Sequence, residues 1–394
     1  MKNKSYSKEI LKITLLITFS TLLAIYMIEI AYSLYNISDY KHKKWKKHKY
    51  TWVEIYKDLK NSGKDAVFSI APYVRTFVST INDENDLFPL SGISNKLTIS
   101  CNESGYWAIY ESDRHGFNNP DEVWDKLNFD YVLIGDSFAH GQCVHEKDTI
   151  AGRLRYKAKV LNLGYGGTGP LLEYATAREY LKYIKTKNVL WFYFDGNDLN
   201  DLKLELSNKI LIKYLKDINF TQGLFNRQKE IDYFGSNALV QELKKYKKKD
   251  NTLFRFEEFN FKNVLFLKSI RHRLSWVFGA NLINPYPFII DYLDEFSELL
   301  TQTNNLVTKN NSKLYFVYLP EYPGIYNSTT DKQRLLRYKK VINLVKRLNI
   351  PIIDLYKDVF SNHSDPKSLF PLRTYGHYNE EGYRLVVKTI LDKI

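Results

Sequence analysis

Five short runs of aliphatic, β-branched and aromatic residues constrain the fold of this chain more than any other feature. The runs are Phe129–Ile134, Lys159–Leu163, Val189–Phe194, Leu314–Leu319 and Pro351–Leu355. Continuous runs of this length are typical of parallel strands that are covered on both faces, and the helical stretches between them suit right-handed crossovers. The sequence therefore predicts an α/β fold in which a five-stranded parallel sheet lies between two layers of helices.

The carboxyl ends of the runs are where a site is expected, because ligands of doubly wound sheets bind beyond those ends. The first run leads into Gly135, Asp136 and Ser137. A serine that follows a strand and opens a helix is well placed for nucleophilic attack, since the helix N-terminus presents positive potential to a developing oxyanion. Asp136 is expected to orient the loop or to cap that helix.

The second and third runs end in residues that can donate hydrogen bonds to the same oxyanion. Gly167 lies in a glycine-rich loop after the second run, where a backbone N–H can approach a ligand closely. Asn197 follows the third run and carries a side-chain amide N–H. Each motif alone is also compatible with an ordinary flexible loop or an Asn-Asp turn that caps the next helix.

A histidine near the C-terminus completes the set. His377 precedes Asn379, which is a good N-cap for a helix whose apolar residues recur with helical spacing. A loop held by that helix suits a general base. His140 competes for this role, because it follows Ser137 by three residues. We favour His377, since a base on a separate element approaches the hydroxyl more freely.

Together, Gly-Asp-Ser, the glycine loop, Gly-Asn-Asp and His-x-Asn-x-x-Gly resemble the motifs of the SGNH (GDSL-type) hydrolase superfamily, over roughly residues 129–394. The resemblance implies a flavodoxin-like α/β/α sandwich with Ser137 as nucleophile and His377 as base. It also implies an oxyanion hole made by the N–H groups of Ser137 and Gly167 and the amide of Asn197. Members cleave or transfer acyl esters through an acyl-enzyme, so neither a metal nor an organic cofactor is expected.

One position departs from the family pattern. The aspartate that usually lies three residues before the base histidine is replaced by Thr374. Asp354 or Asp365 is predicted to supply the orienting carboxylate instead, or a Ser–His dyad acts alone. Because of this departure, a non-catalytic, glycan-binding relative of the family is an alternative to an enzyme.

The N-terminal part predicts a membrane anchor. Residues 1–12 form a short tail, and residues 13–35 are apolar over the length that a spanning helix needs. No small-residue cleavage motif follows, so an uncleaved anchor is expected. Residues 36–100 are expected to be a stalk and connecting segment, and residues 101–394 the hydrolase-like domain, with an insertion at 200–310.

Most of the net charge of +13 comes from two lysine-rich stretches, residues 1–49 and 244–249. The rest of the chain is nearly neutral and has no DNA- or RNA-binding motif, so no nucleic-acid partner is expected. The lysines flank the anchor on both sides, and counted alone they favour a cytoplasmic domain.

The layout of anchor, stalk and domain is similar to that of membrane-tethered SGNH proteins associated with bacterial surface polysaccharides. This resemblance implies a single-pass protein whose domain lies outside the cytoplasm. In an exported domain Cys101 and Cys143 are able to pair, whereas otherwise they are two buried thiols. The expected activity is that of a serine esterase on an O-acyl ester of a carbohydrate or lipid. The alternative is an acyltransferase, such as an O-acetyltransferase of a surface polysaccharide, that uses the same residues.

Overall fold

The computed structural model describes residues 2–47, 51–70, 87–250, 264–267, 270, 292–322, 328–374 and 376–394. The chain forms two compact units. The first comprises Met1–Lys49 and Lys247–Phe288, and the second comprises Tyr50–Tyr246 and Ile289–Ile394. The second unit contains the sheet and all of the predicted site residues.

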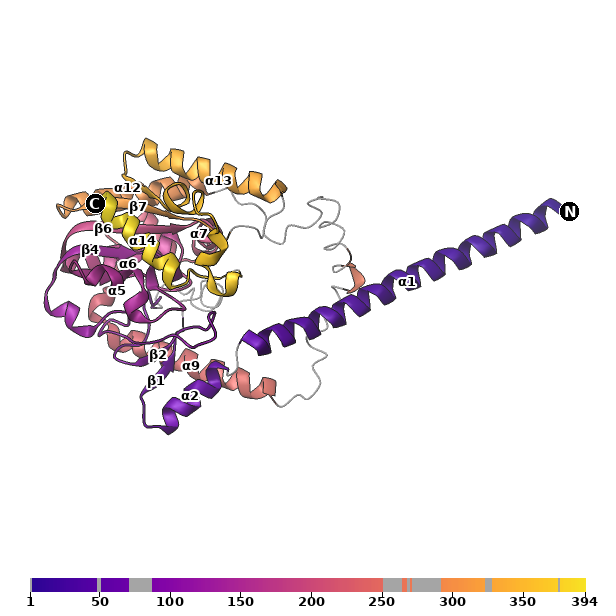
Figure 1. The fold of residues 1–394 in the computed structure, drawn as a ribbon, viewed down its shortest axis with the longest axis horizontal. Coiled ribbons are helices and arrows are strands. Elements are labelled where there is room, and N and C mark those ends of the chain that lie inside the picture. The colour runs from indigo at the N-terminus through magenta and orange to yellow at the C-terminus, as the bar shows by residue number, and fades with distance from the viewer. Residues whose placement is uncertain are drawn as a thin grey trace. The chain divides into compact units, whose positions relative to one another are not determined.

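The sheet of the second unit has five strands, all parallel, in the order β5-β4-β6-β7-β8 (Figure 1). The strands are β4 (Asn128–Ile134), β5 (Val160–Asn162), β6 (Lys185–Phe194), β7 (Lys313–Leu319) and β8 (Ile352–Asp354). All five predicted strands are confirmed, and the order is that of a flavodoxin-like doubly wound sheet. The chain passes from β4 to β5 on one side and then to β6 on the other, so the switch point lies between β4 and β6.

Both faces of the sheet are buried, which explains why the strands appear in the sequence as continuous apolar runs. Along β6, Trp191 and Tyr193 face one core, whereas Leu190 and Phe192 face the other. The same alternation holds along β7. Side chains of successive strand residues point to opposite faces, so each strand contributes to both cores.

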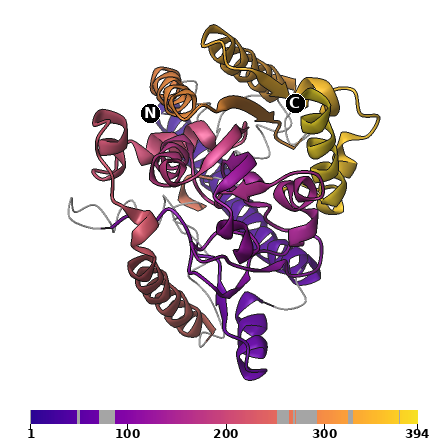
Figure 2. The same cartoon turned by 90° about the vertical axis from the view of Figure 1, so that its left-hand side faces the viewer.

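Two helical layers cover these faces. The layer on the side of Trp191 includes α6 (Pro170–Tyr180), α12 (Leu293–Lys309) and α13 (Ser328–Arg347). The layer on the side of Phe192 includes α5 (Ile150–Arg155) and α14 (Glu380–Lys393). Figure 2 shows α12, in orange, and α14, in yellow, on different sides of the sheet. The second unit is therefore the predicted three-layer sandwich.

Residues upstream of the sheet differ from the expected stalk. They form α2 (Trp52–Asn61), β1 (Ala66–Phe68) and β2 (Leu97–Ile99), and β2 also pairs with β3 (Ile109–Glu111). This small sheet belongs to the second unit. Its strands bury apolar side chains such as Val67 against α2 and α9 (Gln228–Asp250), which explains why the segment folds onto the domain.

The expected insertion at 200–310 is likewise divided. Its beginning forms α7 (Asp198–Glu205) and α8 (Leu211–Lys216), and its end forms α12; these three helices pack against α6. They thus complete a long crossover between β6 and β7. Residues 247–288 belong to the first unit, and most of them lie outside the described residues.

The first unit contains one long helix, α1 (Lys2–Lys47), which covers the predicted tail and anchor. Its span Glu9–Tyr32 is long and apolar enough to cross a membrane, with a mean hydropathy of 2.0. Glu29 is buried, and its carboxylate accepts a hydrogen bond from the backbone N–H of Ile270 at 2.8 Å. Tyr26 donates to the carbonyl of Leu265 at 3.3 Å. The one acidic residue of the predicted anchor is therefore satisfied by backbone of the same unit.

Candidate active site

Ser137 opens α4 (Ser137–His140) directly after β4. Asp136 caps this helix, because its Oδ1 accepts a hydrogen bond from the N–H of Phe138 at 2.9 Å. Gly135 has φ +152, and a Cβ there would lie 2.9 Å from the Cβ atoms of both Ala139 and Phe192. Only glycine therefore allows the strand to turn into the helix this closely. Ser137 itself is partly exposed, as a nucleophile must be.

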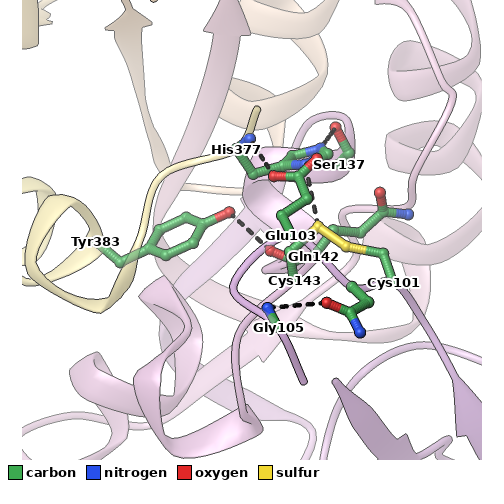
Figure 3. The surroundings of a disulfide bond; sticks show 9 residues. Cys101, Glu103, Gly105, Ser137, Gln142, Cys143, His377 and Tyr383 are labelled. Atoms are coloured by element: carbon green, nitrogen blue, oxygen red, sulfur yellow. Dashed lines mark hydrogen bonds and ion pairs between the residues drawn. A yellow bond between two sulfur atoms is a disulfide. The ribbon is translucent and has the colours of Figure 1, made fainter. Parts of the chain in front are cut away.

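His377 lies against Ser137, with its Nε2 2.8 Å from the serine Oγ (Figure 3). On the other side of the ring, Glu103 Oε1 lies 3.1 Å from Nδ1, and Glu103 Oε2 accepts the backbone N–H of His377 at 2.7 Å. An ionised carboxylate only accepts hydrogen bonds, so Nδ1 carries the proton and Nε2 is left to accept from the serine hydroxyl. The three side chains form a Ser–His–Glu arrangement.

The charges around His377 favour its protonated form. Burial lowers the pKa of the imidazole, but the hydrogen bond and charge of Glu103 and the charge of Asp136 together outweigh burial. The net effect raises the pKa of His377 above its usual value. A base with a raised pKa accepts a proton more readily, which is what general-base chemistry at neutral pH requires.

Glu103 occupies the position that was predicted for Asp354 or Asp365, and both of those predictions are wrong. Asp354 accepts hydrogen bonds from the hydroxyl of Tyr338 and the backbone of Lys357. Asp365 forms an ion pair with Arg373. Both carboxylates are thus engaged elsewhere. The structure also differs from a Ser–His dyad without an orienting carboxylate, since Glu103 contacts both the backbone nitrogen and Nδ1 of His377.

His140, the competing histidine, is fully buried in the core beside the nucleophile helix. Its ring packs edge-on against Tyr110 at 5.1 Å between centroids, and neither ring nitrogen has a partner among the described residues. Burial lowers the pKa of His140 to about 3, with a further contribution from the charge of His377. It is therefore a neutral packing residue at ordinary pH.

The two candidate oxyanion donors lie at the same edge of the sheet. Gly167 has φ +79, and its loop is tied to the nucleophile turn because the neighbouring Thr168 hydroxyl donates to the carbonyl of Gly135 at 3.3 Å. Asn197 directly precedes α7, and its Nδ2 donates to Oδ2 of Asp201 at 2.6 Å. An amide nitrogen carries two hydrogens, and Asp201 engages one of them and so fixes the plane of the amide. Gly167 and Asn197 are both partly exposed.

A network of buried hydrogen bonds holds the loops of the site together. The carboxylate of Asp113 accepts four hydrogen bonds, two from backbone N–H groups and two from the side chains of Asn119 and Trp124. Asn118 donates to the carbonyl of His140 at the end of the nucleophile helix, and Asn119 bonds the backbone of Asn162 in β5. The segment 113–119 therefore fixes the loops that follow β4 and β5.

Cys101 and Cys143 are joined in a disulfide beside His377 (Figure 3). Cys143 Sγ lies 3.2 Å from His377 Nδ1. Four side chains place possible metal-ligand atoms within 4.8 Å of one another, a separation compatible with a metal ion: Cys101, Glu103, Cys143 and His377. Metal binding by cysteine requires thiolates, however, and in the disulfide neither sulfur is one. The set therefore fits a metal only when it is reduced.

The fold and site together define a flavodoxin-like α/β protein with a serine, a histidine and a carboxylate at the carboxyl edge of its sheet. No family model matches the chain, and no curated protein matches it.

Solved structures that are similar to the chain include a lipolytic protein of the G-D-S-L family from Desulfitobacterium hafniense DCB-2, at 13% identity and a TM-score of 0.35, covering 68% of this chain and 100% of that one. A lipase/acylhydrolase from Enterococcus faecalis is 14% identical, with a TM-score of 0.35 and coverages of 67% and 94%. The acetyl xylan esterase AlAXEase is 12% identical, with a TM-score of 0.34 and coverages of 67% and 98%.

Proposed function

We propose that this chain is a serine esterase of the SGNH type that cleaves an O-acyl ester through an acyl-enzyme. The observation that carries the proposal is the 2.8 Å contact between Ser137 Oγ and His377 Nε2, with Glu103 on the opposite nitrogen. A nucleophile, a base and an orienting group within hydrogen-bond reach is the arrangement that activates serine.

The reaction uses each residue at a stated atom. Ser137 Oγ attacks the ester carbonyl while Nε2 of His377 takes the hydroxyl proton. The N–H groups of Ser137 and Gly167 and the amide of Asn197 stabilise the tetrahedral oxyanion. The imidazolium then protonates the departing alcohol, and the acyl group remains on Ser137. Water activated by His377 attacks this acyl-enzyme and releases the acid. Positioned proton transfer contributes roughly 10² to 10⁴-fold to such a rate.

We propose an acylated carbohydrate or lipid as the substrate and a membrane-anchored location outside the cytoplasm. The apolar span of α1 supports an anchor, and a disulfide supports an oxidising compartment. A glycan hydroxyl that replaces water as the acceptor would make the same residues an acyltransferase. The contact of Glu103 with His377 supports the catalytic proposal over a non-catalytic, glycan-binding relative, since Thr374 supplies no carboxylate.

A fluorophosphonate probe tests the proposal, because it reacts covalently with an activated serine. The full-length protein in detergent should be labelled once per chain, and Ser137→Ala should abolish labelling and turnover of p-nitrophenyl acetate. Ser361→Ala, at an exposed serine of the same domain, is the matched control and should be labelled normally. Labelling that survives in Ser137→Ala would remove this serine from the proposed role.

Product analysis separates hydrolase from transferase and identifies the substrate class. Acetylated oligosaccharides and long-chain acyl lipids are offered separately. Release of free acid supports the esterase, whereas acyl transfer to an added glycan supports the acyltransferase. Turnover of neither class by a protein that still hydrolyses p-nitrophenyl acetate would contradict the proposed substrates.

A further inference from the structure

The carboxylate that orients His377 is covalently tied to the nucleophile loop. Glu103 lies two residues after Cys101, in the loop between β2 and β3, and Cys143 lies six residues after Ser137. The disulfide joins these two loops (Figure 3), and the Cα atoms of the two cysteines lie 5.0 Å apart. The same bond therefore connects the loop that carries Glu103 to the loop that carries Ser137.

Hydrogen bonds also hold the loop that carries Glu103. At the base of its loop, Ser100 N–H donates to Ala108 C=O and Ala108 N–H donates to Cys101 C=O, each at 2.9 Å. At the tip, the Tyr106 hydroxyl donates to Glu380 Oε1 at 2.6 Å. The side chains of Glu103 and His377 are 21% and 19% exposed, so the contact between them is mostly shielded from solvent. The disulfide adds a covalent constraint to these contacts.

Cys143 shows a further sign that the disulfide shapes the site. Its φ is +70, in the left-handed region that residues with a side chain rarely adopt. Such a conformation persists where the surroundings over-determine it. Cys143 Sγ also lies 3.2 Å from His377 Nδ1, the nitrogen that Glu103 contacts. A disulfide sulfur is an uncharged, weak acceptor, so in the oxidised protein the Glu103 carboxylate is the stronger partner of that N–H.

From these contacts we infer that the Cys101–Cys143 disulfide is a positioning element of the active site, which holds Glu103 on His377 and makes activity depend on the thiol–disulfide state. This inference rests on the proposed function. A dithiol reductant attacks one sulfur through its thiolate, the S–S bond breaks, and the second thiol of the reductant closes its own disulfide. The protein gains two electrons and two protons as the thiols of Cys101 and Cys143, and the loop of Glu103 is released.

The test compares full-length protein in detergent before and after dithiothreitol. The chain has only two cysteines, so alkylation and mass spectrometry report the state of this one bond. Reduction should lower kcat for p-nitrophenyl acetate roughly 10-fold or more, with KM nearly unchanged, and reoxidation should restore it. Unchanged kcat in protein shown to be reduced would overturn the inference.

A double-mutant cycle distinguishes positioning from general stabilisation. Cys101→Ser with Cys143→Ser should lower kcat in the wild-type background but change it less than about twofold in a Glu103→Gln background, because the effect passes through Glu103. An equal loss in both backgrounds would show that the disulfide merely stabilises the fold. The acid limb of kcat/KM should also move to lower pH in the double serine variant, since Glu103 no longer favours the imidazolium. A purely structural role would leave that limb in place.

Gly376→Ala offers a variant with the disulfide intact. A Cβ at Gly376 would collide with the Glu103 carboxylate, which is the flexible end of a side chain. The substitution should displace Glu103 without unfolding the domain and reproduce the loss in kcat. Normal kcat and an unmoved pH profile in Gly376→Ala would contradict the role given to Glu103 here.

NMR titration of labelled histidine keeps this inference separate from the proposed function. The pKa of His377, assigned by its loss in His377→Gln, should fall in the double serine variant even if no ester is turned over. A protein without esterase activity but with this fall would refute the proposed function alone. An unchanged His377 pKa would refute the positioning role.

Discussion

At the scale of single residues, Glu103 determines how His377 behaves as a base. Its two oxygens contact the ring nitrogen Nδ1 and the backbone N–H of His377, so it fixes both the tautomer and the orientation of the ring. The charge of this carboxylate raises the pKa of the imidazole, against the lowering effect of burial. In the proposed mechanism we therefore expect activity to rise as the pH passes through that raised pKa and the imidazole becomes neutral.

Glu103→Gln should lower kcat/KM by roughly 10² to 10⁴-fold, because an amide can hold the wrong tautomer of the histidine. It should also lower the pKa of His377, so the remaining activity should appear at lower pH than in the wild type. The pH profile of p-nitrophenyl acetate hydrolysis measures both effects. Glu381→Gln is the control, since Glu381 pairs with Arg384 on the surface. An acid limb that stays in place would exclude Glu103 from this role.

Asn197→Ala should reduce kcat by roughly 10² to 10³-fold with little change in KM, as expected when one oxyanion donor is lost. The donor stabilises the transition state and contributes little to binding of the ground state. Its loss should therefore lower kcat and leave KM nearly unchanged. Steady-state kinetics with p-nitrophenyl acetate measure the two constants. Asn362→Ala, at an exposed asparagine of the same domain, should leave them unaltered. A rise in KM alone would indicate that Asn197 binds substrate instead.

Ser137 and His377 could be predicted from the sequence because each follows a recognisable strand or precedes a recognisable helix. Glu103 could not, since it is 274 positions from His377 and lies in a segment without a clear period. The one signal that pointed to it is Cys101, two residues upstream. A disulfide from Cys101 to Cys143 would have brought that segment to the nucleophile loop. Asp354 is a candidate from the sequence because it lies at the end of a predicted strand, where site residues are expected.

At the scale of elements, α6 is held at its N-terminus by a side chain of another helix. Glu205, at the end of α7, accepts the backbone N–H groups of Gly169 at 2.6 Å and Leu171 at 2.9 Å. These are among the donors that a helix leaves unsatisfied at its start. Because Gly167 lies in the loop that enters α6, this contact also fixes a candidate oxyanion donor.

Glu205→Ala should lower the free energy of unfolding by about 2 to 4 kcal/mol, since it leaves buried N–H groups without a partner. Urea unfolding followed by tryptophan fluorescence measures this change. Glu230→Ala, in an exposed pair with Arg227, should change stability by less than about 1 kcal/mol. Equal stability of the two variants would show that Glu205 does not cap α6.

The long strands were predictable because burial on both faces leaves a continuous apolar run. The strands β1, β2 and β3 have three residues each, which is too short for any period to appear. They are stabilised by packing against α2, which directly precedes β1, and against α9, which is distant in the sequence. The segment therefore resembled a stalk until its tertiary contacts were known.

At the scale of the whole molecule, the disulfide and the lysines that flank the apolar span favour opposite membrane orientations. The lysines after the apolar span outnumber those before it, which by the positive-inside rule favours a cytoplasmic domain. The disulfide requires an oxidising compartment, which cytoplasm rarely provides. If the disulfide positions Glu103, a cytoplasmic domain would lose its orienting carboxylate. The covalent requirement is therefore the stronger of the two arguments.

We accordingly expect the domain to face outward. A membrane-impermeant fluorophosphonate-biotin applied to intact cells that express the full-length chain should label Ser137 as strongly as it does after lysis, and Ser137→Ala should remove the signal in both samples. A cytoplasmic enzyme labelled in parallel reports on leakage. Labelling that requires lysis would place the domain in the cytoplasm, where the two cysteines would be reduced and Glu103 freed. The same experiment, repeated with alkylation of the cysteines before lysis, then shows whether the bond exists in the cell.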